Sequence, residues 1–333
     1  MPEIIRNRNS ASICNLSLGS VLQTPIVIRS LLSEFGRLEY APMEFEFIIN
    51  NDPQGFVVEQ ELKAYHSLDR KQTMDYNPRA SGVTATITVQ YDEYHGEELM
   101  WIIHYAVDEF LRFIALFLGF CQRRRIILGS VSTRPLNTKF LWIGPVGFQG
   151  ELIDSIGYGQ EVIDPENLQY ALSSAVSTYI ASTLEEREHL SMLLRRYNDI
   201  LNLPYTYEKF DGFWRIIECL GKGSVMSSGQ DDEYKRLLLV VGAPNGSKNL
   251  KNFIGALLIN NITYTDDSIC SAFKYRNEST HNYLKKIVID APSLSKDYQF
   301  VAECAERLIC MAFGLDQIYY KKATCIIIVN RVF

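Results

Sequence analysis

The sequence predicts an α+β protein, in which a β-containing N-terminal module precedes an all-helical bundle. Two patterns lead to this prediction. Before about residue 160, apolar and polar side chains alternate as they do in strands, most clearly at residues 83–90. From Pro165 onward, apolar side chains recur three and four positions apart, as in amphipathic helices. A chain of 333 residues is long enough for two domains, which we expect at residues 1–160 and 161–333.

The N-terminal module is predicted to be β-rich and to be built around one central helix, the apolar segment 97–120. Alternation at residues 38–50 predicts a strand, and the turn residues that follow predict a hairpin with residues 56–64. A short helix is expected at residues 27–35. Short apolar runs predict further strands at residues 125–131, 140–146 and 148–153.

The second half is predicted to be a helical bundle with short connections. Its apolar stripes indicate helices around residues 168–179, 190–201, 210–220, 250–258, 266–277 and 301–312. Residues 222–231 are polar and glycine-rich, and we expect a loop there.

The charge balance limits which partners the protein can have. The chain carries 39 acidic and 33 basic side chains, a net charge of −6. Proteins that bind nucleic acid through a long, non-specific phosphate footprint usually have a basic excess. The composition therefore argues against such a footprint, while a small cleft that accepts a few phosphates stays compatible with it.

Cysteine usage and hydropathy indicate a cytoplasmic protein without a membrane partner. The seven cysteines form no CxxC pair, and Cys219, Cys270, Cys304 and Cys310 lie in apolar helical runs. This pattern is typical of reduced, buried thiols. The N-terminus lacks a signal-peptide core, and polar residues interrupt the longest apolar stretch, 100–120. We therefore expect a core helix there instead of a membrane span.

One arginine stands out in the second half. Arg276 falls on the same helical face as three apolar residues, Ile269, Ala272 and Phe273. A guanidinium on that face needs an acid, a phosphate or a water-filled cleft, because burying it unpaired costs several kcal/mol. His281 lies off this face in a straight helix, so the two side chains can converge only if the helix ends or turns within residues 278–280.

Arg276, followed directly by Asn277 and, after three more residues, by His281, resembles the motif of the HEPN domain family. The resemblance covers roughly residues 165–325, a helical region. It implies a metal-independent endoribonuclease without a cofactor, of the kind found among toxins and antiviral-defence effectors. It also implies a homodimer, in which two Arg…His pairs line one cleft and RNA is the substrate.

The resemblance also implies a role for each motif residue. The 2′-hydroxyl of the RNA attacks the adjacent phosphate, and His281 would act as general base or acid, since histidine titrates near pH 7. Arg276 would clamp the phosphate with bidentate geometry, and Asn277 would position the phosphate or the histidine. No His/Cys cluster has metal-ligand spacing, so we expect no metal site.

A non-catalytic HEPN-like dimerisation or binding module remains the alternative. In that case Arg276 would pair with an internal acid, and Glu218 is the candidate because it lies on the edge of an apolar helical stripe. A Glu218–Arg276 pair fits both hypotheses, since it would also orient the guanidinium.

The basic run of Arg123, Arg124 and Arg125 follows the central helix. It is either a solvated helix end or a contact for the phosphates of RNA. The N-terminal module has no recognisable motif, so a sensor or specificity role, with a possible regulatory partner protein, follows from the architecture alone.

Overall fold

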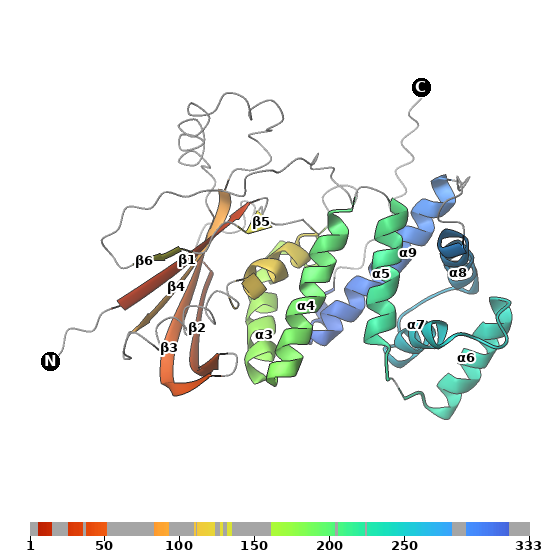
Figure 1. The fold of residues 1–333 in the computed structure, drawn as a ribbon, viewed down its shortest axis with the longest axis horizontal. Helices are drawn as coiled ribbons and strands as arrows, with labels where there is room; N and C mark the ends of the chain where they lie inside the picture. The colour runs from red at the N-terminus through yellow and green to blue at the C-terminus, as the bar shows by residue number, and fades with distance from the viewer. Residues whose placement is uncertain are drawn as a thin grey trace, which may run out of the picture.

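The computed structural model describes six strand segments and a helical part. The strand segments are residues 6–14, 26–35, 38–51, 83–92, 127–128 and 132–134. The helical part comprises residues 110, 112–123, 161–203, 206–223, 225–281 and 291–319, and its side chains are described except at residues 165, 279–281 and 291–295. Figure 1 shows the strands on one side of the molecule and the helices on the other.

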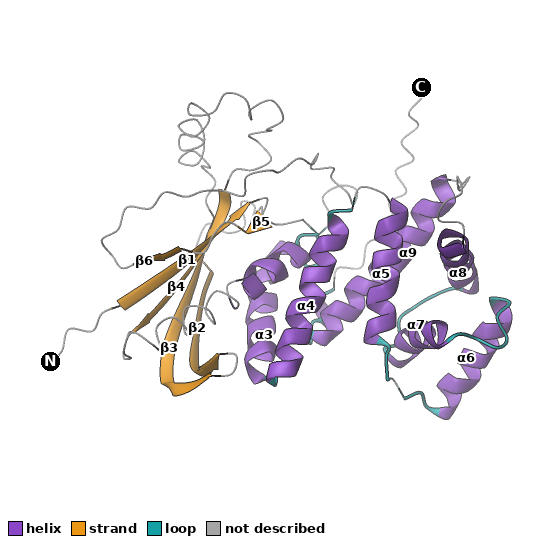
Figure 2. Cartoon of the chain, in the orientation of Figure 1, coloured by secondary structure: helices purple, strands orange, loops and turns teal. Residues whose placement is uncertain are grey.

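The strands form one antiparallel sheet (Figure 2). Its order is β2-β3-β4-β1-β5, and β6 pairs with β1 as well. The strands are β1 (Arg6–Cys14), β2 (Ile26–Phe35), β3 (Leu38–Asn51), β4 (Val83–Asp92), β5 (Ile127–Leu128) and β6 (Ser132–Arg134). The alternating residues 83–90 lie in β4, between β3 and β1.

The structure differs from two local predictions for this region. The short helix predicted at residues 27–35 is wrong, because these residues form β2, which opens with the β-branched run Ile26-Val27-Ile28. The strand predicted at residues 38–50 exists as β3, but it pairs with β2 and β4. Its predicted partner, residues 56–64, lies outside the described residues, as do the strands predicted at residues 140–146 and 148–153.

Seven α-helices follow among the described residues of the second half. They are α3 (Leu168–Ala181), α4 (Leu184–Leu201), α5 (Thr206–Leu220), α6 (Ser228–Val240), α7 (Lys248–Ile259), α8 (Asp266–His281) and α9 (Ala291–Ala312). A 3-10 helix, η1 (Pro165–Asn167), precedes them, and a second, η2 (Asp316–Ile318), follows. Between residues 161 and 319 the described backbone is helical apart from its connections and one isolated bridge, between Ile163 and Tyr319.

The helix at residues 112–121 packs inside this helical array. The ring centroids of Phe113 and Tyr179 of α3 lie 4.2 Å apart. Phe120 meets Tyr197 of α4 edge-on at 5.0 Å, and Phe117 meets Phe313, just after α9, at 5.2 Å. All of these rings are buried except that of Tyr179, which is partly buried, and they make the helix a member of the helical core (Figure 1, in gold beside α3).

The predicted α+β fold, with a β-rich module built around a central helix, is therefore wrong. The helix assigned to that module belongs to the bundle, and the residues with described side chains, from 110 to 319, are helical apart from their connections. Its aromatic residues recur at helical spacing, and this periodicity shows that the helix is buried but not which elements bury it.

Local signals explain where two of the helices begin. Thr183 and Ser227 form capping boxes with Glu186 and Gln230, in which side chain and backbone bond reciprocally. The box at Ser227 starts α6 inside the loop predicted at residues 222–231, so this loop is shorter than predicted.

The α5–α7 contact sets the distance between two of the central helices. Trp214 stacks on Phe253 with ring centroids 3.8 Å apart. After α5 the chain passes so close to α7 that a Cβ atom on Gly221 would lie 1.9 Å from the carbonyl oxygen of Asn252. Only glycine fits there without moving backbone.

The cysteines and the helix lengths bear on the remaining general predictions. Cys304 and Cys310 are buried as predicted, whereas Cys270 is half-buried and Cys219 is exposed. Cys219 lies on the side of α5 opposite its aromatic core residues, so its apolar sequence neighbours were misleading. Among the described residues, no helix combines the length and the apolar character needed to cross a bilayer.

Candidate functional site

The motif residues lie at the C-terminal end of α8, the helix that Figure 1 places at the end of the array farthest from the sheet. Ile269, Ala272 and Tyr275 form its buried face. Arg276 is half-buried and Asn277 is exposed. The motif thus begins where the helix passes from the core to the surface.

The backbone of α8 stays helical through position 281. The turn within residues 278–280 that would bring Arg276 and His281 together is therefore not formed. In a regular helix, positions five apart project about 140° away from each other. Position 281 instead shares its helical face with Asn277, one turn earlier. The side chain of His281 lies outside the described residues.

Tyr275, the residue before Arg276, packs its ring against the core and has several polar groups nearby. Its ring packs edge-on against Phe210 of α5, with centroids 4.7 Å apart. Its hydroxyl is buried and makes no hydrogen bond with any described residue. Burial raises the pKa of Tyr275, and the nearby Asp211, Tyr207 and Asp297 raise this pKa further. Acidic groups from α5 and α9 therefore gather beside the motif.

Asp297 connects the motif helix to α9. Its side chain is only 5% exposed, and its Oδ2 accepts a hydrogen bond from Ser271 Oγ of α8 at 2.8 Å. Burial raises the pKa of Asp297, and the Ser271 hydrogen bond opposes that shift. Neither residue was among the predicted site residues. The only feature of the sequence that points to Asp297 is its position directly before Tyr298, a core residue.

Glu218 of α5 has a different partner from the one considered in the sequence. Its Oε1 accepts a hydrogen bond from Trp214 Nε1, one turn earlier, at 2.7 Å. The side chain is half-buried and holds the indole in place. The Glu218–Arg276 pair stays a prediction.

The basic run 123–125 begins inside the core. Arg123 is 8% exposed, and its Nε donates to Glu306 Oε1 of α9 at 2.6 Å, while its Nη2 donates to Oε2 of the same carboxylate. A guanidinium held in this way is occupied by the protein and is not available to a phosphate. Arg124 and Arg125 lie outside the described residues.

Glu306 is the centre of this buried polar network, which we call the Glu306 network. It is fully buried and also accepts the hydroxyl of Tyr197 at 2.8 Å. Burial alone would lower the pKa of Arg123, but Glu306 raises that pKa above its ordinary value. Burial raises the pKa of Tyr197, and Glu306 raises it further. A sequence signal exists, since apolar Ala302 and Ile309 flank Glu306 at helical spacing.

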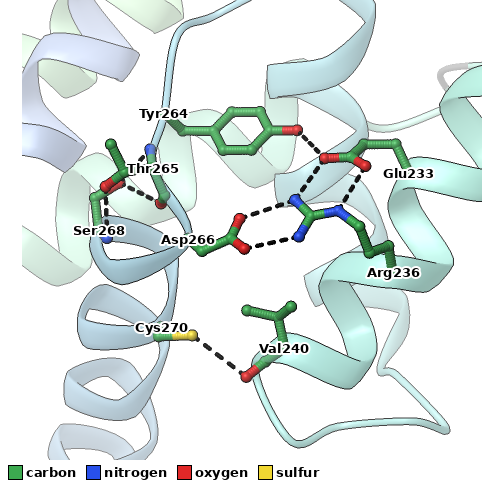
Figure 3. A network of polar contacts seen from close by, with 8 residues as sticks. All are labelled: Glu233, Arg236, Val240, Tyr264, Thr265, Asp266, Ser268 and Cys270. Atoms are coloured by element: carbon green, nitrogen blue, oxygen red, sulfur yellow. Dashed lines mark hydrogen bonds and ion pairs between the residues drawn. The ribbon is translucent and has the colours of Figure 1, made fainter.

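A second arginine network, which we call the Arg236 network, lies on the surface (Figure 3). Arg236 of α6 binds both oxygens of Glu233, at 2.7 Å each, and both of Asp266, at 2.7 and 2.8 Å. Tyr264 donates to Glu233 at 2.7 Å. Asp266 is the first residue of α8, where a negative charge suits the helix dipole. This network fixes the start of the motif helix against α6.

Within the part of the chain that the structure describes, no three His, Cys, Asp or Glu side chains gather as metal ligands would. The polar chemistry near Arg276 consists instead of carboxylates, hydroxyls and an exposed amide, from Asp211, Asp297, Tyr275 and Asn277. Such groups can bind and orient a polar partner by hydrogen bonds.

Comparisons with other proteins give no independent guide to this site. No family model matches the chain, and neither curated proteins nor solved structures give a match. The HEPN resemblance therefore rests on the residues Arg276, Asn277 and His281 and on their helical setting. Any function for this chain has to be argued from its own side chains.

Proposed function

We propose that the helical half is a metal-independent endoribonuclease of the HEPN type, acting in the cytoplasm as a toxin or antiviral-defence effector. The observation that carries the proposal is the position of Arg276 and Asn277 at the end of α8, where the helix leaves the core of a helical bundle. A half-buried arginine beside an exposed amide is suited to holding a phosphate that approaches from solvent.

The proposed reaction is a transesterification within the RNA backbone. His281 takes the proton of the ribose 2′-hydroxyl, and the 2′-oxygen attacks the adjacent phosphorus. The bond from phosphorus to the 5′-oxygen of the next nucleotide breaks, and that oxygen receives a proton from a histidinium. Arg276 stabilises the charge that develops on the phosphate oxygens. The products are a 2′,3′-cyclic phosphate and a free 5′-hydroxyl.

The regular helix favours a site completed by a second copy of the chain. Because Arg276 and position 281 project in directions about 140° apart, one α8 helix alone does not present both to one phosphate. Two α8 helices that face each other can present Arg276 of one copy and His281 of the other to the same phosphate. The proposal therefore includes a homodimer, with RNA as substrate.

A non-catalytic dimerisation or binding module is the second candidate. The observation that favours it is the pair of carboxylates, Asp211 and Asp297, near Tyr275, the residue before Arg276. Carboxylates near a phosphate-binding arginine compete with the phosphate for its charge. In this case α8 would hold a partner protein, and RNA would remain intact.

RNA cleavage by matched variants separates the two candidates. Purified wild-type protein, His281→Ala and Arg276→Ala are incubated with mixed RNAs in the presence of a chelator, and RNA length is followed on gels. We expect wild-type cleavage and complete loss in both variants, with unchanged circular dichroism and unchanged mass in solution. Lys251→Ala, which removes an exposed cation from α7, serves as control and should cleave normally.

Two results would contradict the proposal. Full cleavage by His281→Ala without added metal would exclude histidine catalysis at this site. Intact RNA with the wild-type protein, together with a stable dimer, would favour the binding module.

A further inference from the structure

The Glu306 network lies where three parts of the chain meet. Arg123 ends the helix at residues 112–121, and only three residues separate it from β5 of the sheet. The chain that returns at Val162 and Ile163 donates two backbone hydrogen bonds to the carbonyl oxygen of Cys121, at 2.8 and 3.1 Å. Ile163 in turn forms a bridge with Tyr319, near the end of the described residues.

Arg123 has an unusual backbone for its residue type. Its φ is 54°, in the left-handed region that normally favours glycine at a helix end. Its backbone N–H caps the helix by donating to the carbonyl oxygen of Phe120 at 3.0 Å. A non-glycine residue stays in this conformation only when its surroundings hold it there. Here the surroundings include Glu306, whose carboxylate accepts hydrogen bonds from Nε and Nη2 of Arg123.

A buried ion pair of this kind specifies position more than it adds stability. The desolvation of both charges offsets most of their attraction, so apolar pairs of similar volume are often as stable. Two parallel hydrogen bonds also fix the orientation of the guanidinium, which apolar side chains cannot do. The pair therefore fixes Arg123, the last described residue before β5.

A fixed Arg123 gives the sheet an attachment to the helical half in addition to the contact between β2 and α3. A single sheet gains stability when one of its faces or edges is held by another layer of the protein. β5 pairs with β1 at Ile13 and Cys14, and β1 pairs with β4 and β6. Because Arg123 lies only three residues before β5, fixing Arg123 limits how far β5 and the strands paired with it can lie from the helical core.

We propose that the Arg123–Glu306 pair is a coupling point through which the helical half stabilises the N-terminal sheet. It makes the two halves unfold together. The proposal does not depend on RNA cleavage. It does bear on the candidate site, because α9 carries both Glu306 and, nine residues earlier, Asp297, which is bound to the motif helix.

The test is urea-dependent amide hydrogen exchange, measured by mass spectrometry on the full-length chain. Peptides from β1 and β4 report on the sheet, and peptides from α5 and α9 report on the helical half. In the wild type we expect both sets to lose protection at the same urea concentration. In Arg123→Met/Glu306→Leu, the sheet peptides should lose protection at a lower urea concentration, while the α5 and α9 midpoint stays in place.

The control replaces an arginine by methionine and a carboxylate by leucine in the surface network. Arg236→Met/Asp266→Leu removes a bidentate arginine–carboxylate pair within the helical half. Its sheet and helix peptides should still lose protection together.

Three results would overturn the proposal. The first is that sheet and helix peptides of Arg123→Met/Glu306→Leu lose protection at the same urea concentration. The second is that the two sets of peptides lose protection at different urea concentrations in the wild type. The third is that they do so in the surface control. If the core double variant fails to fold, Arg123→Lys decides. Lysine keeps the charge but not the two parallel hydrogen bonds, so the sheet midpoint should fall below the helix midpoint. Unchanged coincidence in Arg123→Lys would overturn the proposal.

Discussion

The Glu306 network and the Arg236 network contain the same chemistry in opposite environments. Each has an arginine bound bidentately by carboxylate and a tyrosine hydroxyl that donates to a glutamate. In the Glu306 network both charged side chains are almost fully buried. In the Arg236 network the side chain of Arg236 is 44% exposed and that of Asp266 47%.

The difference shows that contact geometry alone does not set the energetic role of an ion pair. Water and salt screen the exposed network, so breaking it leaves charges that solvent accepts. Breaking the buried pair leaves a charge in the core that solvent cannot reach. We therefore expect large, salt-independent effects from the Glu306 network and small, salt-dependent effects from the Arg236 network.

The largest effect is expected from Arg123→Met. It leaves the Glu306 carboxylate buried without its cation, which costs about 3–5 kcal/mol of unfolding free energy. Urea denaturation followed by circular dichroism measures this loss. Adding Glu306→Leu to the same chain should restore most of the stability of the helices. If the single variant is as stable as the wild type, the pair is not the buried contact described here.

Tyr197→Phe should have an intermediate effect. It removes the hydroxyl that donates to Glu306 but keeps the ring that packs against Phe120. A hydrogen bond to a charged group contributes about 1.5–3 kcal/mol. Thermal unfolding should show the loss both at low and at high salt. A loss that disappears at high salt would place this hydroxyl in contact with solvent.

Arg236→Met should lower the thermal midpoint only slightly, and less than Tyr197→Phe. The reason is that solvent rehydrates Glu233 and Asp266 once the arginine is gone. The difference from wild type should shrink further as sodium chloride is added. A large, salt-independent drop would remove the distinction between the two networks.

The smallest effect is expected in the acid dependence of stability. Hydrogen bonds from Arg236 lower the pKa of Glu233 and of Asp266. A carboxyl with a lowered pKa in the folded state stabilises the fold above its unfolded pKa, and this stabilisation is lost as pH falls through the folded pKa. Thermal midpoints measured from neutral to acidic pH should therefore fall less steeply in Arg236→Met than in wild type. Identical slopes would contradict the lowered pKa values.

Periodicity predicted the helices well where one face is apolar, as in α3, α4, α5 and α7. It failed at α6, whose start depends on the Ser227–Gln230 capping box inside a polar stretch. For the helix at residues 112–121 it predicted the helix but not its place in the bundle, because the pattern within a buried helix does not show which elements pack against it. The helix predicted at residues 27–35 is strand β2 instead, since its apolar residues fit both periods over so short a segment.

At the candidate site, the sequence indicated Arg276 from its place on an apolar face. It did not indicate Asp297, whose importance comes from contact with Ser271 across two helices. Nor did it show that Arg123 would turn inward, since a run of three arginines is usually solvated. Contacts between residues far apart in the chain depend on how the helices pack, and the pattern within one helix does not contain that information.

The chemical ends of the RNA products test the proposed function most directly. RNA is incubated with wild-type protein and chelator, and the fragments are analysed by mass spectrometry. Attack by the 2′-hydroxyl, with His281 and Arg276 at the phosphate, predicts fragments with a 2′,3′-cyclic phosphate and a 5′-hydroxyl, and none with His281→Ala. Fragments with a 5′-phosphate and a 3′-hydroxyl, or cleavage that survives His281→Ala, would contradict it.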